Sequence, residues 1–114
     1  MDKAAARREY KEAKRPMGVY RIRNTGNGRN YIGFSTNALA RMNRHKAELG
    51  FRSERSQELQ GDWDTFGEAA FEFEVLDELD QEVDSRTSPV DDLRVLADMW
   101  VSKLEKAGES VIRL

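Results

Sequence analysis

Two short runs of alternating apolar residues predict a β-hairpin. Residues 17–24 and 30–35 are rich in Val, Ile, Tyr and Phe, and the glycine-containing segment 25–29 separates them. The Asn-Gly pair and its second glycine suit the positive-φ positions of a tight turn between antiparallel strands. Side chains alternate across a strand, so Tyr20 and Tyr31 can project from the same side of the sheet if the register allows it.

Three later segments repeat their apolar residues at helical spacing. They are residues 38–49, 55–66 and 90–107, each ending at or near a glycine, and Asn37 caps the first of them. Between the second and third helices, residues 71–75 alternate Phe, Glu, Phe, Glu and Val, the period of a half-buried strand. The pattern predicts a small α/β (α+β) domain in which helices flank a three-stranded, mostly antiparallel sheet.

Two further segments, residues 2–14 and 80–89, show no strong alternation of apolar and polar residues. Residues 2–14 are strong helix formers that stop before Pro16, which predicts a marginal basic helix, and the acidic segment 80–89 has the composition of a loop. The chain is then expected to divide into an N-terminal basic helix, one domain and a C-terminal tail, at residues 1–16, 17–107 and 108–114.

Composition narrows the class of protein. A chain of 114 residues is the size of one domain, and it has no cysteine, which excludes disulfides and thiolate chemistry. No apolar stretch approaches the roughly 20 residues of a membrane span. A soluble, cytoplasmic protein without a membrane partner is expected.

Charge is distributed unevenly along the chain. Residues 1–60 hold 14 Lys and Arg against 6 Asp and Glu, whereas residues 61–114 hold 5 against 15. A basic half suits a polyanion such as DNA, although a solvated surface of mixed charge explains the same numbers equally well. The cations expected to hold phosphates are Arg21, Arg23, Arg29, Arg44 and Lys46.

A group of residues in and after the hairpin has a joint spacing that structural roles alone do not explain. It consists of Gly18-Val19-Tyr20, Tyr31-Ile32-Gly33 and, one helical turn apart, Arg41 and His45. Each residue alone has an ordinary structural explanation. Together, in this order and at these distances, they resemble the signature of the GIY-YIG nucleases, and the resemblance extends over about residues 17–104, including Trp100.

The resemblance implies hydrolysis of phosphodiester bonds in DNA with one divalent cation, Mg²⁺ or Mn²⁺, and no other cofactor. In this interpretation Arg41 stabilises the charge that builds on the phosphate, and Tyr20 is the general base. Tyr31 would position the water or the phosphate, and His45 would assist proton transfer. The hydroxyls of Tyr20 and Tyr31 and the guanidinium of Arg41 are expected to meet in one open cleft beside residue 97.

The chain departs from this family's pattern where a glutamate on the last helix would hold the metal. Ala97 occupies that position, and Asp98 lies about 100° further round the helix, which makes it a poor substitute. Natural loss or an engineered knock-out would explain the alanine, and the otherwise intact set of site residues favours the second. Glu54 also stands where some relatives have histidine, and the C-terminus lacks an asparagine that many members carry.

The sequence therefore predicts an endonuclease domain impaired by Ala97, in which Ala97→Glu would restore nicking with Mg²⁺ or Mn²⁺. The main alternative is a non-catalytic nucleic-acid-binding module, which would bind DNA in a strongly salt-dependent manner. A protein-interaction domain is the third hypothesis, but it gives Tyr20, Tyr31, Arg41 and His45 no purpose.

Overall fold

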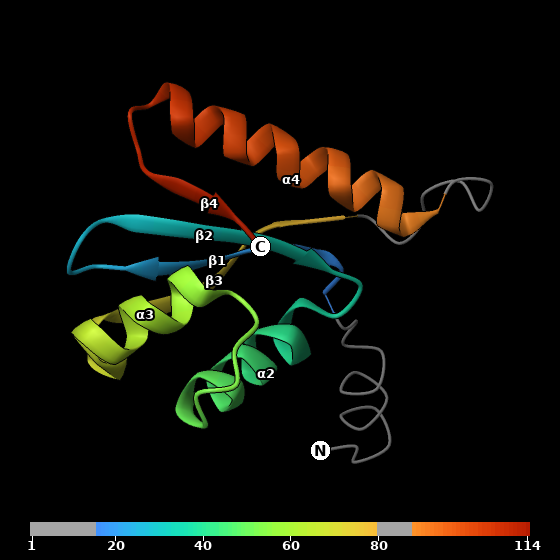
Figure 1. Ribbon diagram of the computed structural model, residues 1–114. Coiled ribbons are helices and arrows are strands. Elements are labelled where there is room, and N and C mark those ends of the chain that lie inside the picture. Colours follow the sequence, from blue (N-terminus) through green and yellow to red (C-terminus); the bar gives the residue numbers. More distant parts are fainter. Residues whose placement is uncertain (1–15, 80–87) are drawn as a thin grey trace, which may run out of the picture.

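A mixed sheet forms the middle layer of the fold (Figure 1). The computed structural model describes residues 16–79 and 88–114, so the helix predicted at residues 2–14 and most of the predicted acidic loop lie outside the described residues. The strands are β1 (Gly18–Asn24), β2 (Arg29–Ser35), β3 (Phe71–Glu78) and β4 (Val111–Arg113). Their order in the sheet is β3-β1-β2-β4, with β1 antiparallel to both β2 and β3.

The prediction of three strands is wrong, because the described residues form a four-stranded sheet. Strand β4 comes from the residues predicted to be a tail and runs parallel to β2, with Ile112 opposite Tyr31. Backbone hydrogen bonds from Asn30 N to Ser110 O (2.9 Å) and from Leu114 N to Ile32 O (2.8 Å) fix its position. Three residues are too few to show a period, and a parallel strand depends on a partner far away in the chain.

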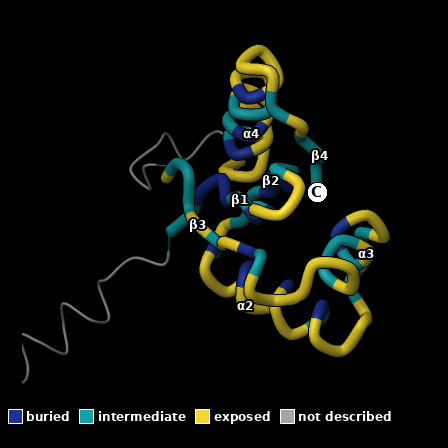
Figure 2. The backbone as a smooth tube through the Cα atoms, turned by 90° about the vertical axis from the view of Figure 1, so that its left-hand side faces the viewer, coloured by how far each residue is buried: buried dark blue, intermediate teal, exposed yellow. Residues whose placement is uncertain are grey.

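Helices cover both faces of the sheet, as Figures 1 and 2 show from two directions. Helices α2 (Ala38–Gly50) and α3 (Gln57–Phe66) lie on one face, and α4 (Pro89–Lys106) lies on the other; a 3₁₀ turn, η1 (Glu68–Ala70), leads into β3. The helices predicted at residues 38–49, 55–66 and 90–107 are confirmed to within two residues at each end. The Asn37 side chain caps α2 by accepting a hydrogen bond from Ala40 N (3.1 Å). Among the described helices none has the length and apolarity that a membrane crossing needs.

The alternation of β1 and β2 divides the apolar residues into two cores. Tyr20, Ile22 and Tyr31 pack with residues of α2 and α3, whereas Val19 and Ile32 pack with Ala97 and Leu104 of α4. Burial of each large apolar side chain contributes roughly 1.5–3 kcal/mol to stability. The two tyrosines thus share a face, as predicted, and Ala97 belongs to the opposite face.

Candidate active site

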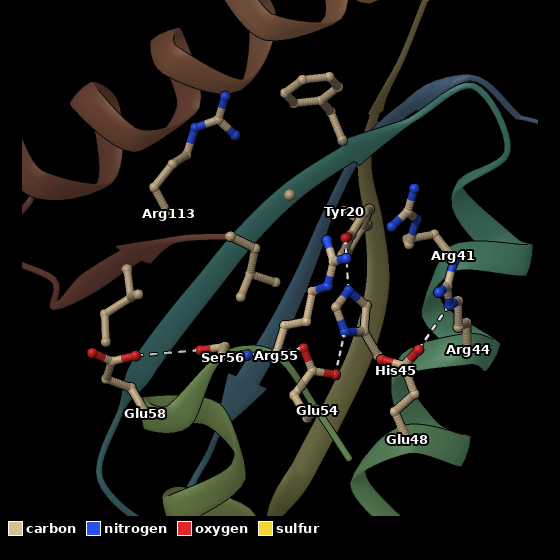
Figure 3. A pocket seen from close by; sticks show the side chains of 14 residues that line it. Tyr20, Arg41, Arg44, His45, Glu48, Glu54, Arg55, Ser56, Glu58 and Arg113 are labelled. Atoms are coloured by element: carbon tan, nitrogen blue, oxygen red, sulfur yellow. Dashed lines mark hydrogen bonds and ion pairs between the residues drawn. The ribbon is translucent and has the colours of Figure 1, made fainter.

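A pocket of about 710 Å³ opens at one end of the sheet, between α2, the segment before α3 and β4 (Figure 3). Polar side chains from all of these elements line it, with Gly33 and Tyr20 of the hairpin between them. The lining includes the polar side chains of Tyr20, Arg41, His45, Glu54, Arg55 and Arg113.

A chain of hydrogen bonds leads from the pocket into the protein. The Tyr20 hydroxyl lies 2.9 Å from His45 Nε2, and His45 Nδ1 lies 2.7 Å from Glu54 Oε2. Because an ionised carboxylate only accepts hydrogen bonds, Nδ1 carries the proton in this arrangement and Nε2 accepts from the Tyr20 O–H. We call this arrangement the Glu54–His45–Tyr20 chain.

Glu54 is held firmly for a residue outside a helix. Its side chain is only 3% exposed, and its backbone N–H donates to Gln60 Oε1 (3.2 Å) at the start of α3. Sequence reasoning noted Glu54 only as a departure from a family pattern. The contact between Glu54 and His45 joins residues nine apart in the sequence and depends on how the 51–56 segment folds back over α2, which the local sequence pattern does not predict.

Burial governs the protonation of Tyr20. Loss of solvent raises the pKa of Tyr20 to about 12; the Arg41 charge lowers it, Glu54 raises it, and Arg113 lowers it, in decreasing order of effect. Tyr20 therefore keeps its proton at neutral pH and donates it to His45. Two arginines from different elements, Arg41 of α2 and Arg113 of β4, therefore both act on the Tyr20 phenol.

Two glycines of the hairpin are required by close approaches. Gly33 faces Tyr20 across the β1–β2 pair, and a Cβ on Gly33 would lie 2.5 Å from both Cζ and the hydroxyl of Tyr20. A Cβ on Gly18 would overlap the backbone carbonyl of Asp77, next to the irregularity in the β1–β3 pairing at Val19 and Tyr20. Gly33 thus leaves room for the Tyr20 side chain, and Gly18 leaves room for the backbone of strand β3.

Tyr31 does not line the pocket, and the predicted meeting of both hydroxyls in one cleft is wrong for this residue. Its hydroxyl donates to Asp62 Oδ2 of α3 (2.6 Å), and Arg29 lies 3.5 Å from the other oxygen of the same carboxylate. Burial and the Asp62 carboxylate raise the pKa of Tyr31 well above its usual value. In this structure Tyr31 joins the hairpin to α3.

The predicted phosphate-binding cations are dispersed. Arg44 lines the pocket and pairs with Glu48 (2.7 Å), but Arg21 pairs with Glu74 on β3. The Lys46 ammonium lies over the Phe73 ring, 4.7 Å from its centroid. Arg23 and Arg29 are likewise absent from the pocket lining. Arg55 and Arg113, which the sequence analysis did not select, line the pocket instead.

Ala97 is also outside the pocket, so the prediction of a cleft beside it is wrong. It is 0% exposed and packs in the apolar core on the α4 face, together with Val19 and Ile32. Its neighbour Asp98 reaches Arg113 instead, with Oδ1 3.4 Å from Nε. The helix rotation that buries Ala97 could not be derived from the sequence pattern alone.

Burial of residue 97 reverses the expectation for Ala97→Glu. A carboxylate placed there enters a packed apolar core, so we expect the free energy of unfolding to fall by about 2–4 kcal/mol, with no gain of metal-dependent nicking. Chemical denaturation and a plasmid-nicking assay with Mg²⁺ or Mn²⁺ measure the two effects. Ala97→Gln separates overpacking from charge, and nicking that appears only with the glutamate and a metal would contradict this prediction.

The sequence itself identifies the class of domain to which this fold and pocket belong. Residues 16–82 match the model of the GIY-YIG catalytic domain, so the chain belongs to the GIY-YIG family, whose nucleases act on phosphodiester bonds. The predicted family resemblance is thereby confirmed. No curated protein gives a significant match.

Solved structures of endonuclease catalytic domains have a similar fold. The catalytic domain of the homing endonuclease I-TevI is 25% identical with a TM-score of 0.66, covering 84% of this chain and 97% of that domain. A glutamate-to-alanine mutant of the catalytic domain of the intron endonuclease I-TevI is 26% identical to this chain, also with a TM-score of 0.66. That match covers 83% of this chain and 90% of the mutant domain. These similarities agree with the family match: the fold of this chain is that of endonuclease catalytic domains.

Proposed function

We propose that this domain binds DNA and hydrolyses a phosphodiester bond of its backbone in the pocket. The observation that carries the proposal is the Glu54–His45–Tyr20 chain, which ends in an open pocket beside the Arg41 guanidinium. The family match and the endonuclease neighbours support the same reaction. Arg41 suits a phosphate because its planar guanidinium directs two donors at two oxygens.

The hydrogen-bonded chain gives the attacking water a path for its proton. The Tyr20 oxygen donates to His45 Nε2 and can accept a hydrogen bond from a water molecule in the pocket. As the water oxygen bonds to phosphorus, its proton passes to the Tyr20 oxygen while the Tyr20 proton passes to Nε2. The resulting imidazolium is stabilised by Glu54, so the raised pKa of the phenol is no obstacle, since a free phenolate never forms.

Nucleases of this family use divalent metals, and the residues present do not fit a metal at position 97. One ligand atom from each of His45, Glu48 and Glu54 does lie within 4.8 Å of the others, which is close enough for a shared ion. However, His45 and Glu54 hold each other, and Glu48 holds Arg44. An ion there would have to replace the bonds that orient Tyr20.

A second candidate function is a DNA-binding module without catalysis. The burial of an alanine at position 97 favours it, because helix α4 then offers the pocket no metal ligand and cleavage is impaired. Nicking of supercoiled plasmid and cutting of labelled single-stranded, branched and duplex DNA distinguish the two candidates. If the protein binds DNA but cuts none of these DNA forms with any metal, the DNA-binding module is the correct function.

Glu54→Gln tests the proton path directly. The neutral amide still reaches His45 but cannot stabilise an imidazolium, so we expect cleavage to slow about 10- to 100-fold while DNA affinity changes less than about twofold. Single-turnover cleavage and fluorescence anisotropy with the same duplex measure the two quantities. Glu58→Gln is the matched control, because Glu58 also lines the pocket but is not part of the chain. Equal losses in both variants would exclude a role for the chain.

A further inference from the structure

Helix α2 ends in a turn that exposes Phe51 and Arg52 to solvent. Phe51 is 85% exposed, more than any other large hydrophobic residue that the structure describes, and the Arg52 side chain is 79% exposed. Single apolar side chains are common on protein surfaces, so the meaning of this one depends on where it lies and on what surrounds it.

The backbone of this turn is strained at Arg52. Its φ is +60°, the one positive value among the described residues other than glycine. The turn has the hydrogen bonds of a Schellman motif, because the Arg52 N–H donates to Leu49 O (3.2 Å) and the Ser53 N–H donates to Glu48 O (2.8 Å). In that motif the left-handed position usually holds glycine, since a Cβ is disfavoured there.

Helix α4 ends in the same motif with glycine at the left-handed position. Gly108 has a φ of +84°, and the N–H groups of Gly108 and Glu109 donate the two corresponding bonds, of 2.9 and 3.0 Å. The same turn is thus built with glycine after α4 and with arginine after α2. The nearest carboxylate does not account for the arginine, because Arg52 Nε lies 3.8 Å from Asp64 Oδ1, beyond hydrogen-bond distance, and both side chains are exposed. A ligand outside the protein gives the strained arginine a function.

The turn continues the side of α2 that lines the pocket. Four side chains of this helix contribute to the lining: Arg41, Arg44, His45 and Glu48 (Figure 3). Phe51 follows Arg44 by seven residues, which is two helical turns, so the two side chains point in nearly the same direction. At about 1.5 Å per residue, Phe51 lies about 9 Å beyond His45 along the helix.

After the turn, the chain returns to the pocket. Glu54, which binds His45, and the exposed Arg55 both line it. Glu54 is the one carboxylate of the 51–56 segment, and it is buried, so the exposed charges of this segment are the two arginines. Positive charge beside an uncovered aromatic ring suits a nucleic-acid strand, whose phosphates attract arginine and whose bases stack on aromatic rings.

We propose that Phe51 and Arg52 form a second contact for the DNA strand bound in the pocket, with Phe51 stacked on an unpaired base and Arg52 bound to a neighbouring phosphate. This contact rests on the proposed function and specifies its substrate class. Bases inside a duplex present their edges to a protein, whereas an unpaired base presents a face on which a phenyl ring stacks. A distance of about 9 Å corresponds to roughly three nucleotides of a strand. The preferred substrate is therefore DNA with an unpaired stretch close to the phosphate that the pocket holds.

The test of Phe51 uses the full chain and two fluorescein-labelled DNAs, a duplex with a short single-stranded overhang and the blunt duplex, in EDTA so that nothing is cut. Phe51→Ala should weaken binding to the overhang DNA about 10-fold and to the blunt duplex less than about twofold. Phe51→Trp should keep the affinity for the overhang, whereas Phe51→Leu, which is apolar but cannot stack, should behave like the alanine variant. Met99→Ala is the matched control, because Met99 is an exposed apolar residue of α4 outside the pocket lining.

The test of Arg52 compares stability with binding. Arg52→Gly removes both the strain and the charge, so the melting temperature should rise by up to about 5 °C while binding to the overhang DNA weakens about threefold. The slope of log affinity against log salt should fall by about 1. Arg52→Gln keeps the strain and removes the charge, so it should lose the same affinity without the gain in melting temperature. A variant that is more stable and binds less cannot owe its loss to misfolding.

Failure of the Phe51–Arg52 contact can be told apart from failure of the proposed function. If the unmodified chain neither binds nor cuts DNA in any form, both fail. If it binds or cuts DNA but Phe51→Ala behaves like Met99→Ala, or weakens the overhang and the blunt duplex equally, the contact alone is overturned.

Two further results would overturn the contact. One is an Arg52→Gly protein that melts at a lower temperature than the original. The other is a sedimentation experiment in which Phe51→Ala separates a self-associated protein without changing its affinity for DNA, because Phe51 would then belong to a protein interface. Binding that prefers the overhang through Phe51, without cutting in Mg²⁺ or Mn²⁺, would reject hydrolysis and support the contact.

Discussion

Replacing Arg41 by alanine is expected to slow DNA cleavage about 100- to 1,000-fold, as loss of one preorganised donor to a transition-state charge does in other enzymes. Arg41 lines the pocket one helical turn before His45 on α2, a position from which its guanidinium can donate to a phosphate bound there. Single-turnover cleavage of a labelled duplex at saturating protein measures the chemical step apart from binding.

Arg44→Ala is the control for the Arg41 variant. Arg44 carries the same charge on the same helix and lines the same pocket, but its side chain is 64% exposed and tied to Glu48. We expect its removal to weaken DNA binding modestly and to leave the cleavage rate within about threefold. Equal losses of cleavage in both variants would mean that Arg41 acts only through the total charge of the pocket.

The second large effect is expected for Gly33→Ala. The added methyl group would lie 2.5 Å from the Tyr20 ring, which is only 3% exposed and has little room to move. Displacing the ring breaks its bond to His45, so cleavage should fall about 100-fold or more, and overpacking should lower the free energy of unfolding by about 1–3 kcal/mol. Urea denaturation and the single-turnover assay measure both.

Gly50→Ala provides the comparison. A methyl group on Gly50, the last residue of α2, would meet no atom within 4 Å. Because alanine also favours the helix more than glycine does, this variant should be as stable as the original or slightly more so. A fully active Gly33→Ala protein would show that Tyr20 need not occupy its position against the glycine.

Local patterns predicted most of the fold because they depend on neighbours in sequence. The hairpin turn, the Asn37 cap and the helical stripes all lie within a few residues of the features that define them. Strand β4 could not be predicted in this way, since its pairing with β2 joins segments from opposite ends of the domain.

The site shows the same division between local and distant information. Arg41 and His45 were placed correctly relative to one another because a helix sets their spacing. Two side chains went elsewhere for reasons of tertiary packing: the Tyr31 hydroxyl reaches Asp62 on α3, and Ala97 turns into the α4 core. The catalytic role of Tyr31 and the loss of metal binding through Ala97 stay predictions, to be judged by the assays above.

Strand β4 has a practical consequence for anyone who purifies the protein. Its neighbour Leu114 borders the pocket beside Arg113, so a polyhistidine tag joined there would emerge at the opening. Such a tag would bring imidazoles and adventitious nickel or zinc to the one place where metal dependence is in question. A cleavable fusion, removed before measurement, avoids a false positive.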